Sequence, residues 1–337
     1  MAYRIFAVAF LVGVTLSQPA RGLDRTQLAI IINVLDPLSV EIGTYYAARR
    51  QILFQNVVKV SFPTGRPALT REDFDAIKAQ VDRQTTPRVQ AYALTWAAPY
   101  RVGCMSITAA FAFGFDPTLC AEGCRPTRIS PYFDSSSSLP FSELAMRPTM
   151  AIAAQTFDEA KRLIDRGIES DASFPSGTAY LLSTTDKARN VRSKWYPMAL
   201  GLFGNKLRVQ VLEQDALRNK DDVLFYFTGK DQVEGLETLH FVPGAIADHM
   251  TSTGGVLIDA GQMSALRWLE AGATASYGTV VEPCNIAQKF PHPLVAIGHY
   301  LSGETLIEAY WKSVRMPGQG IFIGEPLAKP FRRPPQR

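Results

Sequence analysis

The sequence predicts an α/β protein whose largely parallel sheet is flanked by helices. Segments with the pattern of strands and segments with the pattern of helices alternate along the 337 residues, and such alternation is typical of strand–helix–strand units. Residues 28–34 (LAIIINV) form a continuous apolar run, as expected of a strand that is covered on both faces. Residues that cap helices precede several of the amphipathic segments.

The first half of the chain shows these signals one after another. The break at 36–37 (Asp-Pro) ends the first strand, and Ser39 can cap a helix over 39–50. Thr70 opens a second helix over 70–81, because an acid stands three residues after this cap. The strands predicted in this part are 28–34, 57–62, 89–96 and 149–154.

Residues 115–148 interrupt the alternation. They contain several prolines, two cysteines and a run of four serines at 135–138. This composition predicts a long surface loop inserted into the domain.

The second half continues the alternation. Thr156 and Glu159 form a capping box for a helix over 156–166. The further strands predicted are 179–183, 207–212, 223–228, 239–246, 274–281 and 321–323. Helices are predicted over 263–271 and 305–314, and the spacing in the last helix turns Glu304 and Glu308 outward.

Residues 1–22 match a secretory signal peptide. A positive start with Arg4 precedes 12 apolar residues at 5–16, and small residues follow at Ala20 and Gly22. We expect cleavage after Gly22 and export to the periplasm or the cell exterior. Twelve apolar residues are too few to span a bilayer, and we expect no transmembrane span in the mature chain.

The net charge of +4 comes from the two ends of the chain. Removing residues 1–22 takes away Arg4 and Arg21 and no acid, which leaves +2. The tail from Lys329 onward is basic, so the body between is slightly acidic and predicts no nucleic-acid binding. We expect a single domain over 23–331, followed by a basic tail at 332–337.

Export permits disulfide bonds. The four cysteines allow three pairings. Cys120 and Cys124 bracket a turn-rich segment (CAEGC) and are expected to close a small loop, which leaves Cys104 and Cys284 either paired or free. A CxxxC pattern without a second Cys or His pair nearby is weak evidence for zinc, and no metal or cofactor is expected.

The densest polar segment of the chain is 243–255 (PGAIADHMTSTGG). Its chemistry-bearing residues are Asp248, His249, Thr251, Ser252 and Thr253. A carboxylate, an imidazole and hydroxyls between glycines suit acid–base catalysis or anion binding. The same residue types also favour turns and caps, which would give them a structural role.

Glu282 and Cys284 stand where the predicted strand 274–281 ends. If this strand and the one before it are parallel neighbours, His249 and Cys284 lie on the same edge of the sheet. A cysteine beside a histidine can form a thiolate–imidazolium pair, which is the activated nucleophile of cysteine peptidases. Asp248 or Glu282 would orient the imidazole in such a hydrolase.

Two alternatives compete with this dyad. Cys284 could form a disulfide with Cys104, or it could be a buried, inert thiol. A metal-dependent hydrolase that uses Asp248, His249 and Glu282 ranks last, because their spacing matches no metal motif. The sequence also contains no P-loop, GxGxxG, HExxH or GxSxG motif, which weakens nucleotide, zinc-peptidase and serine-hydrolase functions.

Several longer segments resemble known families. The order of AGATASYGTVVEP, GETLIEAYWKSV and GIFIGEPLAKPF resembles the end of gingipain-like cysteine peptidases, which have a caspase-type fold. In this chain, the EA pair of those enzymes corresponds to residues 308–309 (EA), and their final turn corresponds to residues 324–326 (GEP). The segments ALTWAAPYRV, PGAIADHMTSTGG, GTVVEP and GEPLAKPF resemble a secreted bacterial family associated with the exosortase sorting system, over about 27–331.

The chain departs from gingipain-like enzymes at both catalytic positions. Those enzymes place His-Gly at the end of one strand and Ala-Cys at the end of the next. The first position here reads Thr228-Gly229, and the second reads 244–245 (Gly-Ala) without a cysteine. The resemblance therefore implies a caspase-like protein that binds envelope proteins or peptides of the sorting system, with Thr228, Gly229 and the hydroxyls of 251–253 as ligand-binding residues.

Overall fold

The computed structural model describes residues 22–120 and 124–333. Its centre is a ten-stranded sheet with the strand order β2-β1-β4-β7-β13-β12-β11-β10-β8-β9, and β3, β5 and β6 form a small second sheet. The predicted α/β architecture with a mostly parallel sheet is confirmed. The predicted signal peptide up to position 21 and the tail residues 334–337 lie outside the described residues.

The strands are β1 (Leu28–Asn33), β2 (Val57–Val60), β3 (Ala68–Leu69), β4 (Ala91–Leu94), β5 (Arg101–Val102), β6 (Met105–Ser106), β7 (Thr149–Ala151), β8 (Thr178–Ser183), β9 (Arg208–Glu213), β10 (Lys220–Thr228), β11 (Leu239–His249), β12 (Ala275–Thr279) and β13 (Gly320–Gly324). The α-helices are α1 (Pro37–Arg50), α2 (Arg71–Gln84), α3 (Ile107–Phe113), α4 (Pro140–Leu144), α5 (Phe157–Glu169), α6 (Tyr196–Phe203), α7 (Leu266–Glu270), α8 (Pro293–Leu301) and α9 (Leu306–Lys312).

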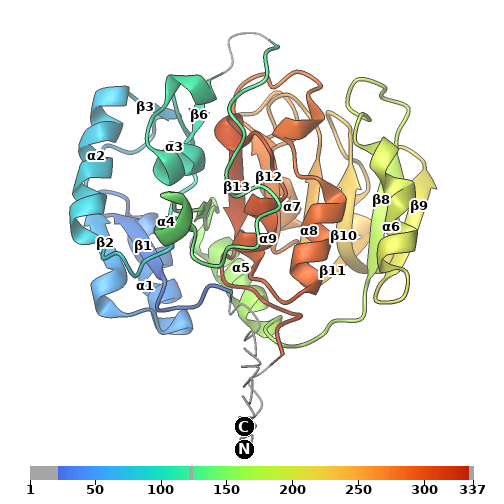
Figure 1. Ribbon diagram of the computed structural model, residues 1–337, viewed down its shortest axis with the longest axis horizontal. Coiled ribbons are helices and arrows are strands. Elements are labelled where there is room, and N and C mark those ends of the chain that lie inside the picture. Colours follow the sequence, from blue (N-terminus) through green and yellow to red (C-terminus); the bar gives the residue numbers. More distant parts are fainter. Residues whose placement is uncertain (1–21, 121–123, 334–337) are drawn as a thin grey trace, which may run out of the picture.

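The large sheet consists of two parallel halves that run in opposite directions. Strands β2, β1, β4, β7 and β13 are parallel to one another, and so are β12, β11, β10, β8 and β9. The halves join where β12 and β13 pair antiparallel, with Ala275 opposite Gly324. Figure 1 shows the first half in blue and green, the second in yellow and orange, and the red β13 between them.

Local signals set the starts of the helices. The hydroxyl of Thr70 accepts a backbone N–H of the first turn of α2. α5 opens with the predicted capping box, in which Thr156 and Glu159 each accept the other's backbone N–H. α1 begins earlier than predicted, because Asp36 rather than Ser39 caps it and a proline takes the first helical position.

Strand β11 is longer than predicted. The expected strand ends at 246, but the observed strand continues to His249. Asp248 and His249 therefore lie in the buried end of a strand rather than in a polar loop, and neither side chain is measurably exposed.

In the predicted insertion at 115–148, the described residues 115–120 and 124–148 are mostly irregular and contain the short helix α4. Part of it packs beside the end of α9. The backbone N–H of Ser130 donates to the carbonyl of Arg315 at 2.8 Å, and that of Asp134 donates to the carbonyl of Lys312 at 2.9 Å.

Two disulfides join Cys104 to Cys120 and Cys124 to Cys284. The expected Cys120–Cys124 pair is therefore wrong, and so is the alternative Cys104–Cys284 pair. The chain before Cys120 passes the turn that carries Cys104, where the backbone N–H of Asp116 contacts the sulfur of Met105 at 3.2 Å. Two disulfides fit an exported protein. Along residues 22–120 and 124–333, no helix combines the length and apolarity needed to cross a bilayer.

Candidate functional site

The ends of β10, β11 and β12 lie along one edge of the sheet. Thr228 at the end of β10 is in register with His249 at the end of β11, and β11 is parallel to β12, which ends at Thr279. We call this edge, marked by Thr228, His249 and Thr279, the strand-end rim. The strands that lead to the sequence-predicted segments 243–255 and 277–285 thus end at the same edge, as expected of parallel neighbours.

Asp248 is engaged in a buried ion pair at this rim. Its Oδ1 lies 2.6 Å from Nη2 of Arg192, and the two side chains are 0% and 1% exposed. The hydroxyl of Tyr310 donates to Oδ2 at 2.8 Å. Burial raises the pKa of Asp248, while Arg192 and Tyr310 act in the opposite direction. The carboxylate is thus paired with Arg192 and bonded by Tyr310, although its Oδ1 accepts no hydrogen bond of good geometry.

Arg192 is the residue that sequence reasoning missed. It lies after β8, and its Nη2 also donates to the carbonyl of Thr228 at 2.8 Å, while Nη1 donates to the carbonyl of Pro291 at 3.1 Å. A buried guanidinium thus fills the space beside the ends of β10 and β11. The only signal in the sequence was an arginine in a loop, which composition alone assigns to the surface.

The imidazole of His249 is held on both sides. Nε1 of Trp268 donates to Nδ1 at 2.9 Å, so the hydrogen-bond pattern assigns the ring proton to Nε2, which donates to the carbonyl of Met263 at 3.0 Å. Burial lowers the pKa of His249 to about 4. The imidazole is therefore neutral at pH 7, and both of its nitrogens are occupied.

Cys284 and Glu282 do not join His249 in a catalytic pair. The sulfur of Cys284 is bonded to Cys124, so no thiolate is available. Oε1 of Glu282 accepts the backbone N–H of Cys284 at 2.6 Å, which fixes the turn in which Cys284 has a left-handed φ of 55°. The predicted dyad of Cys284 and His249 is wrong, because the sulfur of Cys284 forms a disulfide with Cys124. The spacing of the four cysteines did not indicate this pairing.

The expected ligand-binding residues hold loops together. An ideal Cβ at Gly229 would lie 1.9 Å from the carbonyl oxygen of Arg189, so the segment after β8 rests directly on this end of β10. The hydroxyl of Thr228 is buried without a hydrogen-bond partner. Nε of Arg189 donates to the hydroxyl of Thr251 at 3.1 Å.

Gln262 organises the loop that follows β11. Its Oε1 accepts from the hydroxyl of Thr251 at 2.8 Å, and from the backbone and hydroxyl of Thr253 at 2.9 and 3.1 Å. The carbonyl of Ser252 accepts from the hydroxyl of Thr279 at 2.9 Å. These bonds give the loop residues Thr251–Thr253 a positioning role beside the rim.

The same loop lines a cavity of about 360 Å³. Its walls come from the loops after β10 and β11, from the start of α7 and from the segment before α5. They consist of Gln155, Gln232, Leu257, Ile258, Asp259, Ala260, Gln262, Met263, Ser264 and Arg267. Three carboxamides therefore surround one open volume, next to the carbonyl of Met263 that fixes His249. We call this volume the amide pocket.

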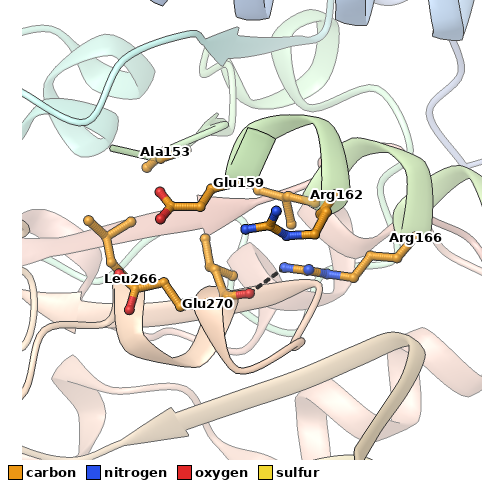
Figure 2. A pocket seen from close by; sticks show the side chains of 9 residues that line it. Ala153, Glu159, Arg162, Arg166, Leu266 and Glu270 are labelled. Carbon is orange, nitrogen blue, oxygen red and sulfur yellow. Dashed lines mark hydrogen bonds between the residues drawn. The ribbon is translucent and has the colours of Figure 1, made fainter. Parts of the chain in front are cut away.

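A second recess lies between α5 and α7 and is too small for an organic ligand. Figure 2 shows Glu159, Arg162 and Arg166 of α5 facing Leu266 and Glu270 of α7. The enclosed volume is about 10 Å³, close to the space of one water molecule. Arg166 donates to the carbonyls at the end of α7, with an Nη2–O distance of 2.6 Å to Leu269, and burial lowers its pKa to about 10. This recess joins two helices and does not resemble a substrate site.

No three histidine, cysteine, aspartate or glutamate side chains gather as a metal site within 22–120 and 124–333. Asp248, His249 and Glu282, which we considered together as metal ligands, make the separate contacts described above.

Comparisons with known proteins give information on the fold. No protein-family model matches the chain, and no curated protein matches it. A solved structure titled "Structure of Protease" is similar, with a TM-score of 0.51 and 10% sequence identity. The similarity covers 91% of this chain and 79% of that chain. At this identity the likeness concerns the fold alone.

Proposed function

We propose that this chain is an exported protein of caspase-like fold that binds a peptide without cleaving it. The observation that carries the proposal is the buried Arg192–Asp248 pair at the strand-end rim. Open α/β sheets bind their ligands at such strand ends, and here a guanidinium and a carboxylate fill that place. With both side chains at most 1% exposed, the pair leaves no opening for a scissile bond.

The state of the expected catalytic residues supports the same proposal. A general base needs a free nitrogen within hydrogen-bond reach of the proton that it takes, and both nitrogens of His249 are engaged. A cysteine nucleophile needs a thiolate, and Cys284 is in a disulfide. Thr228, at the position of the gingipain-like histidine, has no acid–base chemistry near neutral pH.

The amide pocket is the place that we propose for the peptide. Carboxamides donate and accept hydrogen bonds without a net charge, so Gln155 and Gln232, which line the pocket, suit the backbone of an extended segment. Ile258 lines the same volume and is 40% exposed, which offers an apolar contact. A volume of about 360 Å³ lies within the range of ligand sites.

The resemblance to the secreted, exosortase-associated family supports a proposal for the class of partner. We propose a segment of an envelope protein that the sorting system handles, which makes this chain an accessory protein of that system.

Site-specific crosslinking in cells would test the proposal. A photoreactive residue at Ile258 lies in the pocket, and one at Phe54, which is 92% exposed on the other half, serves as a control. We expect a crosslink to an envelope protein from position 258 only. The crosslinked segment is then synthesised and titrated against the purified, oxidised protein.

In that titration the variant Gln155→Ala/Gln232→Ala should bind more weakly. Two unsatisfied hydrogen bonds in a desolvated site correspond to roughly 10- to 100-fold in affinity. Gln84→Ala on α2 is the matched control, because this exposed glutamine lies outside the pocket. Equal affinity of both variants would contradict the assignment of the pocket. Cleavage of the segment by the wild type, lost on His249→Ala, would contradict the non-catalytic function.

A further inference from the structure

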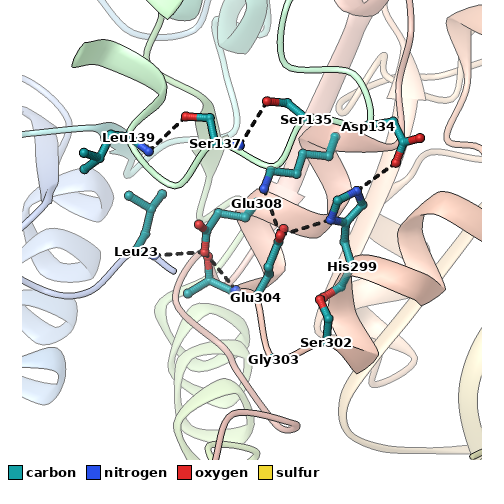
Figure 3. A network of polar contacts seen from close by, with 12 residues as sticks. Leu23, Asp134, Ser135, Ser137, Leu139, His299, Ser302, Gly303, Glu304 and Glu308 are labelled. Atoms are coloured by element: carbon teal, nitrogen blue, oxygen red, sulfur yellow. Dashed lines mark hydrogen bonds and ion pairs between the residues drawn. The ribbon is translucent and has the colours of Figure 1, made fainter. Parts of the chain in front are cut away.

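The residues on either side of the expected cleavage point are buried. Gly22 and Leu23 are both buried, and the backbone N–H of Leu23 donates to Oε2 of Glu308 on α9 at 2.9 Å. Figure 3 shows Leu23 reaching this carboxylate beside Glu304 and His299. The carbonyls of Gly22 and Leu23 both accept from Nη1 of Arg332 at 3.1 Å.

Two charged atoms next to Gly22 lack partners. Oε2 of Glu308 also accepts the backbone N–H of Thr305 at 3.0 Å, but Oε1 is buried without a hydrogen bond. Nη2 of Arg332 is buried without a hydrogen bond as well, and lies 3.7 Å from Oε2. Buried polar atoms without a hydrogen bond are costly, so Oε1 calls for a further donor.

Gly22 lies against both side chains. An ideal Cβ at Gly22 would lie 2.1 Å from Nη2 of Arg332 and 2.6 Å from Oε2 of Glu308. The guanidinium and the carboxylate therefore both lie close to the backbone of Gly22.

We propose that the mature chain begins at Leu23 and that its new α-ammonium group is the partner of Glu308. Hydrolysis of the Gly22–Leu23 bond adds one water, leaves a carboxylate on Gly22 that departs with the leader, and gives Leu23 a protonated amine. The ammonium keeps the bond to Oε2 and has further N–H groups for Oε1. This inference rests on the proposed export but not on the proposed peptide binding.

The surroundings favour a cation at this position. Burial raises the pKa of Glu308, and Glu304 adds to that effect. Lys312 is committed to Glu304 at 2.8 Å, and the phenol of Tyr132 is neutral because burial raises its pKa well above the usual value. After cleavage Arg332 keeps two of its three backbone carbonyls, because Nε donates to Gly303 at 2.9 Å and Nη1 to Leu23 at 3.1 Å, while the bond from Nη1 to Gly22 is lost with the leader. Cleavage before Leu23 creates an α-ammonium group there, and this group supplies the cation for Glu308.

Two measurements test this inference. The first is the amino-terminal sequence of the exported protein, which should begin at Leu23. The second is the rate at which an amine reagent modifies the amino terminus of the full oxidised chain, prepared to begin at Leu23 by traceless tag removal. We expect the Leu23 amine to react at least about tenfold more slowly than in Glu308→Gln, because an ion pair that raises its pKa by one unit lowers the free-amine fraction tenfold.

Glu304→Gln is the matched control, because this neighbouring carboxylate bonds His299 and Lys312 and not Leu23; it should leave the Leu23 amine slow to react. If Glu308→Gln does not fold, a wild-type chain that begins at Gly22 replaces it, and its amine should react fast. An exported chain that begins at another residue overturns the inference. So does a Leu23 amine that reacts equally fast with and without Glu308.

Discussion

Replacing Arg192 by methionine removes the cation of the buried pair but keeps most of the side-chain volume. Asp248 would then be a buried carboxylate with Tyr310 as its only donor in the structure described above. Removing one partner of a fully buried pair typically costs about 3–5 kcal/mol, and no screening by solvent reduces this value when the side chains are 1% and 0% exposed. We expect a loss in this range from a total of roughly 5–15 kcal/mol.

The assay is urea unfolding of the oxidised protein. An m-value equal to that of the wild type would show that the variant unfolds in a comparable transition. The double variant Arg192→Met/Asp248→Asn should recover part of the loss, because it contains no buried charge. Lowering the pH should also reduce the loss in Arg192→Met. Without Arg192 the pKa of Asp248 rises further, so the folded state takes up a proton that the unfolded chain has released.

Arg218→Met is the matched control for this prediction. Arg218 pairs with Glu234 at 2.8 Å, but the side chains are 49% and 75% exposed, and such pairs contribute at most about 1 kcal/mol. A loss in Arg192→Met no larger than in Arg218→Met would refute the view that the Arg192–Asp248 pair holds the strand-end rim closed.

Three further outcomes follow from the site. The imidazole of His249 should show no titration between pH 5 and 8 by NMR, because its folded pKa is about 4. Its contribution of about 3 kcal/mol to the free energy of unfolding is present above pH 6.5, and it is lost as the pH falls toward 4 because the unfolded chain binds a proton first. Gly229→Ala should destabilise the fold by more than about 2 kcal/mol, since the new Cβ meets a backbone oxygen at 1.9 Å, whereas Gly201→Ala in α6, with nothing within 4 Å, should be neutral or stabilising in the same unfolding assay. Replacing Cys124 and Cys284 by alanine removes a link over 160 residues and should cost roughly 2–5 kcal/mol, and a thiol assay should find no reactive cysteine in the untreated protein.

The parts of the fold that sequence predicts well are those encoded by neighbouring residues. The capping box of Thr156 and Glu159 needs only a few residues, and it is observed as predicted. The apolar run at 28–34 predicts a buried strand, and all six residues of β1 are buried, whereas Val34 after it is 44% exposed. The reversal between the sheet halves has no such signal, because strand order depends on pairing between distant segments.

The prediction of the site failed where the partner of a residue lies far away in the sequence. Asp248 and His249 look like loop residues until Arg192 and Trp268 are placed beside them. Glu308 was expected on the outward face of its helix, but it is buried against Thr305 and Leu23. In each case a polar residue in the interior is stabilised by groups that no local pattern reveals.

The position of β13 has a consequence for how the chain is made. The last strand in the sequence is inserted in the middle of the sheet, between β7 and β12. Until residues 320–324 are synthesised, each half of the sheet has an open edge and the two halves cannot join. Folding that depends on such distant pairing is slow. For the export proposed above, this delay would keep the chain unfolded and competent for translocation until its final strand has been made.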